Sequence, residues 1–214
     1  MKNSRSYSQR LEKVLRSLEQ KFPKVEKARH EDPAEALVHA TVTENMSDSA
    51  AQSALNRMWD YFVDLNDLRV SRQEEIVEVL GPNTAEARET ASKINSILWS
   101  IFRKYNTVSL ELLKKMSKRP AKQMLEKMEG VSHFAVNYCM LTSLGGHAIP
   151  LTKGMLEYLR ASELVHPEAT EEEIEGFLTR QISAAKAYEF YRLVRQESES
   201  GAVVKRPAHK AKKK

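Results

Sequence analysis

The side chains best suited to chemistry are Glu44, His133, His147 and Lys153. A histidine beside a glutamate can transfer protons as acid and base, and a lysine can act as a nucleophile. The sequence gives no sign that Glu44 and the two histidines converge. Lys153 is expected at the start of a helix, where a lysine is usually a solvated charge that faces phosphate. The histidines and acids do not have the spacing of metal ligands, so no metal site is expected.

A tight turn between two apolar segments is a second candidate. It lies in the stretch LEKMEGVSHFAVNY, residues 125–138, where apolar residues recur at helical spacing before Gly130 and again from Phe134. This spacing predicts two short helices joined by a hairpin. Gly130 permits a left-handed turn, and backbone N–H groups at the start of the second helix suit a phosphate. The pattern alone is more typical of an ordinary corner between two core helices.

The cysteine content and the composition exclude several classes of protein. Cys139 is the only cysteine in the 214 residues, so a disulfide within the chain and a four-cysteine zinc or iron–sulfur site are ruled out. Its apolar neighbours predict a buried thiol. No apolar run reaches the roughly 18 residues of a membrane span, and the first 20 residues lack the apolar core of a signal peptide. We expect a cytoplasmic monomer without a membrane partner, associated with the nucleoid if the source is bacterial.

The end of the chain carries the positive charge. Residues 205–214 have a net charge of +6, whereas residues 1–204 have a net charge of −1. Such a segment cannot bury enough apolar surface to fold, and basic tails bind nucleic-acid phosphates with release of counterions. We therefore expect a disordered tail that contacts nucleic acid, with a merely solubilising tail as the alternative. Its cations are Lys205, Arg206, Lys210, Lys212, Lys213 and Lys214.

Helical signals run through nearly the whole chain before this tail. An apolar stripe from Leu11 to Phe22 predicts the first helix. Asp32-Pro33 is an N-cap followed by proline at the first helical position, and Thr170 precedes a run of acids that suits a helix N-terminus. No alternating strand pattern appears, so the fold class is all-α with about ten helices. The expected division is residues 1–30 as an N-terminal helix, 31–198 as the main helical domain and 199–214 as the tail.

Large aromatic residues recur at helical spacing in two of the expected helices. Trp59, Tyr61 and Phe62 lie in one, and Trp99 and Phe102 lie in the other. Such stripes are more often core than platforms for stacked bases. We therefore predict that these aromatic side chains mostly face inward.

The ordered set of elements from Asp32 to Arg195 resembles the endonuclease III branch of the helix-hairpin-helix (HhH-GPD) DNA glycosylases. LVHATVTENMSD (residues 37–48) is similar to that family's Leu-Leu-Ser-x-Gln-x-x-Asp segment, and LEKMEGVSHFAVN (residues 125–137) to its hairpin Leu-x-x-Leu-Pro-Gly-Val-Gly-Arg-Lys-Thr-Ala-Asn. The stretch from Tyr138 to Leu159 aligns without gaps with the helix, glycine and loop that follow the hairpin. The resemblance covers roughly three quarters of the chain. It implies a two-lobed fold with a cleft between the lobes.

The catalytic positions of that family are changed here. Phe134 lies where the resemblance places the lysine that attacks the sugar C1′ in the glycosylase/lyase members, and Thr152 lies where it places the aspartate that stabilises positive charge on the sugar. A phenyl ring cannot attack, and a neutral hydroxyl cannot replace a carboxylate. No catalytic residue is therefore assigned, and Lys153, one residue further on, is the weak substitute. Asn45 and Phe134 are expected in the cleft, where Phe134 would impair base flipping.

The cofactors of the family are not expected either. The four cysteines of its iron–sulfur loop would follow the last helix, but RLVRQESESG, residues 192–201, stands there. Ser132 replaces the second hairpin glycine, which argues against a monovalent cation held by hairpin carbonyls. No cofactor is predicted.

These observations favour a DNA-binding protein of the base-excision-repair glycosylase type with a degenerate active site. DNA is the expected partner, bound without sequence preference. The residues expected to bind it are Gly130, Val131, Ser132, His133, Lys153 and the six cations of the tail. One alternative is an active DNA glycosylase or AP lyase that uses rearranged residues. The other is a protein-interaction module that kept the fold and lost DNA binding.

Overall fold

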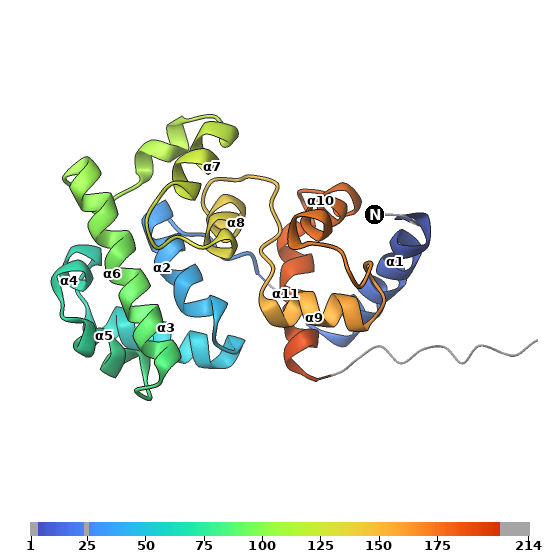
Figure 1. Cartoon of the computed structure of the whole chain (residues 1–214), viewed down its shortest axis with the longest axis horizontal. Helices are drawn as coiled ribbons and strands as arrows, with labels where there is room; N and C mark the ends of the chain where they lie inside the picture. Colours follow the sequence, from blue (N-terminus) through green and yellow to red (C-terminus); the bar gives the residue numbers. More distant parts are fainter. Residues whose placement is uncertain (1–3, 24–25, 202–214) are drawn as a thin grey trace, which may run out of the picture. The chain divides into compact units, whose positions relative to one another are not determined.

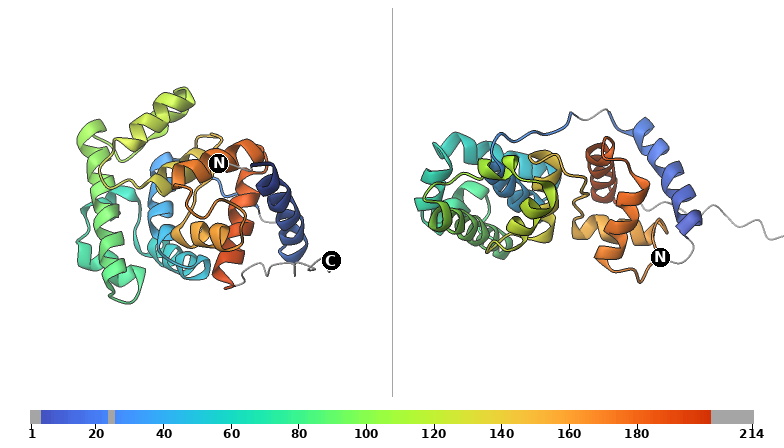
Figure 2. Two further views of the ribbon diagram at one scale, coloured as in Figure 1. Left: turned by 45° about the vertical axis from the view of Figure 1, so that its right-hand side comes forward. Right: turned by 90° about the horizontal axis from the view of Figure 1, so that it is seen from above.

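The computed structural model describes residues 4–23 and 26–201, and within these ranges it contains eleven α-helices, one 3₁₀-helix and no strand. The expected all-α architecture is therefore confirmed. The chain forms two compact units (Figures 1 and 2). Unit 1 combines residues 1–25 with residues 151–214, and unit 2 is the continuous stretch 26–150. The expected N-terminal helix thus shares a unit with the C-terminal third of the chain.

Unit 2 is an assembly of helices around α2, which packs against α3, α6 and α8. Its sixteen-residue cluster of buried side chains includes Leu55, Met58, Ile76 and Ile94 from α3, α5 and α6. The elements of unit 2 are α2 (Pro33–Glu44), α3 (Asp48–Tyr61), α4 (Leu65–Val70), α5 (Gln73–Leu80), α6 (Ala85–Tyr105), the 3₁₀-helix η1 (Glu111–Lys115), α7 (Lys118–Glu126) and α8 (His133–Thr142).

The start of α2 also positions η1. Asp32 is the N-cap of α2 and accepts a hydrogen bond from Ala34 N at 2.8 Å, as its sequence predicts. The same carboxylate accepts from Leu110 N at 2.9 Å and from the Ser109 hydroxyl. One aspartate therefore caps a helix and fixes the segment that leads into η1, although that segment lies almost 80 residues further along the chain.

Unit 1 consists of α1 (Ser4–Lys21), α9 (Lys153–Ala161), α10 (Glu171–Gln181) and α11 (Ala187–Glu199). Helix α11 packs against α1 and α9. Leu11 and Leu18 of α1 are buried, as the apolar stripe predicts. Ion pairs join α1 to the rest of the unit, since Arg10 lies 3.1 Å from Glu163 and Lys21 lies 2.5 Å from Glu197.

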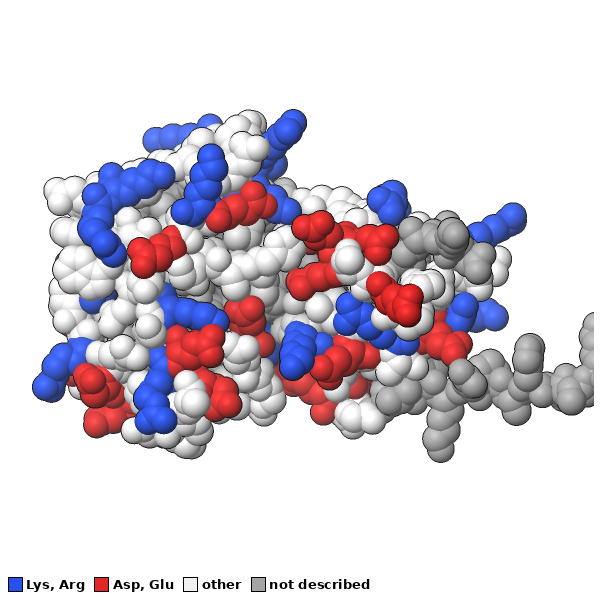
Figure 3. Space-filling view, viewed as in Figure 1, with Lys and Arg blue, Asp and Glu red and all other residues white. Residues whose placement is uncertain are grey.

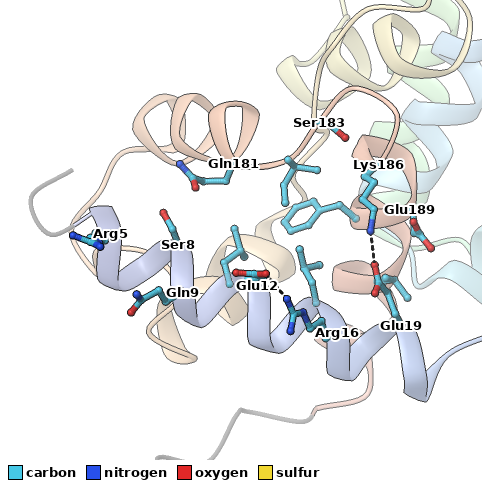
Figure 4. A pocket seen from close by; sticks show the side chains of 15 residues that line it. Arg5, Ser8, Gln9, Glu12, Arg16, Glu19, Gln181, Ser183, Lys186 and Glu189 are labelled. Carbon is cyan, nitrogen blue, oxygen red and sulfur yellow. Dashed lines mark hydrogen bonds and ion pairs between the residues drawn. The ribbon is translucent and has the colours of Figure 1, made fainter.

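A cavity of about 640 Å³ lies between α1 and the start of α11 in unit 1 (Figure 4). Its polar rim includes the ion pairs Lys186–Glu19 at 3.0 Å and Arg16–Glu12 at 2.6 Å. The apolar part of the lining comprises Leu11, Leu15, Ile182, Phe190 and Leu193.

The helix caps follow the sequence, but the aromatic stripes do not. Thr170 forms a full capping box with Glu173, as the acidic first turn indicated. Phe62 is buried, but Trp59, Tyr61 and Trp99 are 40 %, 57 % and 39 % exposed, so the inward prediction was wrong for these three.

Arg69 of α4 explains the exposure of Trp99. Its guanidinium lies 4.3 Å from the centre of the Trp99 ring and 3.9 Å from that of Phe102, and it is itself only 7 % exposed. The indole therefore covers a cation rather than the apolar core. The short helix α4, which the periodicity did not predict, supplies this arginine.

Candidate functional site

The predicted hairpin is present in unit 2. Helix α7 ends at Glu126, residues 127–132 form the turn and α8 begins at His133. Within the turn, Met128 N donates to Leu125 O at 3.1 Å and Val131 N donates to Met128 O at 3.4 Å. Gly130 has a φ of +82°. This is the left-handed conformation that was predicted for it, and a glycine adopts it readily because it has no Cβ.

Gly130 is also required by the helix behind it. A Cβ at this position would lie 3.1 Å from Ser96 Cβ, 3.2 Å from Lys93 O and 3.3 Å from Ile97 Cγ1, all on α6. The turn is therefore pressed against α6 as well as wound in an unusual direction. Both constraints fix the path of the backbone between α7 and α8.

Ser132 closes the turn with two hydrogen bonds. It is the N-cap of α8, and its hydroxyl oxygen accepts from Ala135 N at 3.1 Å. The same hydroxyl donates to Glu44 Oε2 at 2.7 Å. Glu44 ends α2, so a carboxylate from a distant helix lies beside the hairpin. Sequence reasoning had named Glu44 without any sign that it reaches this turn.

The first turns of α8 pair His133 with Asn137 and Phe134 with Tyr138. Asn137 Nδ2 donates to His133 Nε2 at 3.0 Å, and His133 is exposed whereas Asn137 is buried. The Phe134 ring is only 3 % exposed and stacks on the Tyr138 ring, with centroids 6.1 Å apart. His147, the third predicted acid–base residue, is exposed in the segment after α8.

Two histidines extend this aromatic row onto α2. The His39 ring stacks on Tyr138 at 5.2 Å with an angle of 7°, and the His30 ring lies 4.8 Å from His39. His30 Nε2 lies 3.3 Å from the Tyr138 hydroxyl. Burial lowers the pKa of His30 to about 4, so this ring is neutral at pH 7. The sequence gave no signal for this cluster, because its members come from three separate segments.

Thr152 and Lys153 begin α9 in unit 1. The Thr152 hydroxyl accepts from Met155 N at 3.3 Å and so serves as the N-cap of α9. Lys153 is exposed at the first helical position, and Asn45, the predicted cleft residue, is exposed at the C-cap of α2. The six predicted cations of the tail lie outside the described residues.

The end of α6, η1 and α7 form a basic face that the sequence reasoning missed. Residues 103–127 carry eight cations and two acids, which gives them a net charge of +6. Acids elsewhere in the chain bring the net charge of residues 1–204 to −1, so the total does not reveal this basic segment. Blue side chains crowd the upper edge of unit 2 around α7 (Figure 3). A charge count over 25-residue windows would have found it. We call this surface the α7 face; it comprises Arg103, Lys104, Lys115, Arg119, Lys122 and Lys127.

The described residues give no support to metal or membrane chemistry. Among them no group of three or more His, Cys, Asp or Glu side chains is arranged to hold a metal ion. None of the helices in the described ranges is long and apolar enough to cross a membrane. Cys139 is fully buried, and this burial raises the pKa of its thiol, as expected for a structural cysteine.

The arrangement of helices and hairpin defines the class of fold. The chain has the helix-hairpin-helix (HhH-GPD) DNA glycosylase fold, since the solved structures that it matches include DNA glycosylases that superpose on most of its length. The resemblance seen in the sequence is thereby confirmed for the fold. No protein-family model matches the sequence, and no curated protein matches it either.

Three solved structures illustrate the likeness. An endonuclease III–DNA covalent intermediate superposes with a TM-score of 0.70 at 16 % identity, covering 89 % of this chain and 85 % of that one. The 3-methyladenine DNA glycosylase MagIII of H. pylori, bound to 1,N6-ethenoadenine, gives 0.67 at 16 % identity, with coverages of 92 % and 98 %. The Clostridium acetobutylicum 8-oxoguanine glycosylase/lyase with DNA gives 0.70 at 14 % identity, with coverages of 94 % and 72 %.

Proposed function

We propose that this protein binds DNA through its hairpin and basic tail and does not cleave the glycosidic bond. The observation that carries this proposal is the contrast between an intact turn and an altered catalytic position. Gly130 keeps its left-handed conformation, whereas Phe134 places a buried phenyl ring where the resemblance calls for a nucleophilic lysine. Thr152, at the expected aspartate position, offers only a neutral hydroxyl that caps α9.

The contact with DNA would be made at the backbone of the hairpin. The turn Gly130–Ser132 leads into α8, whose positive dipole end favours an anion. Glu44 moderates this attraction, because its carboxylate lies 2.7 Å from Ser132 Oγ. Affinity at the hairpin alone is therefore modest, and the cations of residues 205–214 would add attraction that does not depend on base sequence.

Binding is tested by measuring the dissociation constant of a labelled duplex across salt for the full chain and for a variant that lacks residues 205–214. Each phosphate contact contributes about 0.9 to the slope of log K against log salt, so deletion of six cations lowers the slope by up to about 5. The shortened protein keeps weaker binding through the hairpin. Absence of DNA affinity in the full chain would contradict the proposal, and complete loss on deletion would assign all binding to the tail.

The absence of catalysis is tested by borohydride trapping on a duplex with an abasic site. We expect no covalent adduct, because no lysine occupies the nucleophile position, and we expect no base release from alkylated or oxidised duplexes. An adduct that forms with the natural protein but not with Lys153→Ala would establish a shifted nucleophile. Lys13→Ala, an exposed lysine of α1, is the matched control.

A further inference from the structure

The α7 face has cations that are not used to stabilise the fold. Lys115, Arg119 and Lys127 are exposed, and none of them forms an ion pair with any other described residue. Their neighbours Lys114 and Lys118 differ, since Lys114 Nζ donates to Glu31 O and Lys118 Nζ donates to Leu144 O. Lys114 and Lys118 therefore hold η1 and α7 against the rest of unit 2. Lys115, Arg119 and Lys127 remain on the surface.

The placement of Arg119 opposes the stability of its own helix. Lys118 and Arg119 occupy the first turn of α7, which contains no acid, and Ser117 makes no capping hydrogen bond there. Cations at the positive end of the helix dipole are unfavourable, whereas an anion at that end is stabilising. Lys118 is partly compensated by Leu144 O, but Arg119 has no such acceptor among the described residues.

The α7 face adjoins the hairpin. Arg103, at the end of α6, lies 3.9 Å from Glu129 in the turn, and Lys127 is the C-cap of α7 and opens the turn. Of the other cations, Lys122 and Arg119 lie on α7 and Lys115 lies in η1, the element before it. The nine residues of α7 extend for about 13 Å, which is the axial length of roughly four phosphates on one strand.

We propose that the α7 face is a second phosphate-binding surface, on which the strand held at the hairpin continues along α7 toward η1. This inference rests on the proposed function, since it extends the contact made by the hairpin. The ligand class is a nucleic-acid backbone without regard to base sequence. Lys115, Arg119 and Lys127, together with the acid-free first turn of α7, supply the attraction. The hydrogen bonds of Lys114 and Lys118 hold the surface in place.

The test compares three versions of the full chain on a labelled duplex between about 50 and 200 mM salt. The first carries Lys115→Gln, Arg119→Gln and Lys127→Gln. The second keeps the charges with Lys115→Arg, Arg119→Lys and Lys127→Arg. The third, a matched control, carries Lys13→Gln, Arg72→Gln and Arg180→Gln, three exposed cations that make no ion pair with described residues.

The neutral triple variant is expected to lower the salt slope by about 2.7 and to weaken binding at least about tenfold, whereas the other two match the natural protein. All the changed side chains are exposed, and thermal unfolding checks that the fold is kept. A contrary outcome is that the neutral triple variant has the same DNA affinity and salt slope as the control, while loss of residues 205–214 or a change at Gly130 weakens binding. That result overturns the proposal for the α7 face and leaves the proposed function standing. If the natural protein has no DNA affinity, the proposed function fails with it.

Discussion

Gly130→Val is expected to lower the free energy of unfolding by about 3 kcal/mol and to weaken DNA binding by more than about tenfold. A side chain with a φ of +82° costs about 1 to 2 kcal/mol, and forcing extra atoms into a packed site costs about 1 to 3 kcal/mol. The new Cβ meets Ser96 and Lys93 of α6 at 3.1 and 3.2 Å. The turn must move away from α6, which displaces the backbone that would face a phosphate. Urea unfolding and duplex titration measure the two effects.

Two companion variants separate the causes. Gly201→Ala has the same unfavourable left-handed backbone, with a φ of +69°, but no atom of the described residues lies within 4 Å of its new Cβ, so only the conformational cost is expected. Glu44→Gln leaves the hairpin in place and removes the negative charge beside Ser132. It should tighten DNA binding about threefold, the size expected for loss of one nearby like charge in a solvated site. Equal DNA affinity for Gly130→Val, Glu44→Gln and the natural protein would exclude the hairpin from binding.

Unit 2 should lose up to about 3 kcal/mol of stability as the pH falls from about 6.5 to about 4, because His30 is buried in its neutral form. In the unfolded chain this histidine takes up a proton near pH 6.5, but in the folded chain its pKa is about 4. Between these values the unfolded state binds more protons, so acid favours unfolding. Above pH 6.5 the contribution is fully present, and below pH 4 no further loss comes from this group.

Urea unfolding at a series of pH values measures this dependence. His30→Gln should flatten the curve between pH 4 and 6.5, while also costing the contact with the Tyr138 hydroxyl at every pH. His166→Gln removes a histidine from unit 1 and should leave the unfolding of unit 2 unchanged. A pH dependence that survives His30→Gln would show that another group is responsible.

The helices could be predicted where their signals are local. Asp32 and Thr170 each cap the helix that follows, because a cap depends on residues within three positions. The hairpin was predicted for the same reason. The Ser132–Glu44 hydrogen bond could not be predicted in this way, because its partners are 88 residues apart and only the packing of α2 on α8 brings them together.

Two failures had different physical origins. Trp99 was predicted to lie in the core because aromatic periodicity does not distinguish a buried face from one that covers a cation. The cation that Trp99 covers, Arg69, comes from another helix. The α7 face was missed because a net charge for residues 1–204 averages a basic surface with an acidic remainder. Charge location, and not total charge, carries the information about partners.

The division of the chain has a consequence for its synthesis. Unit 2 is one uninterrupted stretch of 125 residues, so it can fold as soon as residue 150 has emerged from the ribosome. Helix α1, although made first, must wait for its partners, since Arg10 pairs with Glu163 and Lys21 with Glu197. Its apolar stripe, with Leu11 and Leu18, is therefore exposed throughout the production of unit 2. A nascent-chain chaperone that recognises amphipathic helices could therefore bind α1 before α11 has been synthesised and can pack against it.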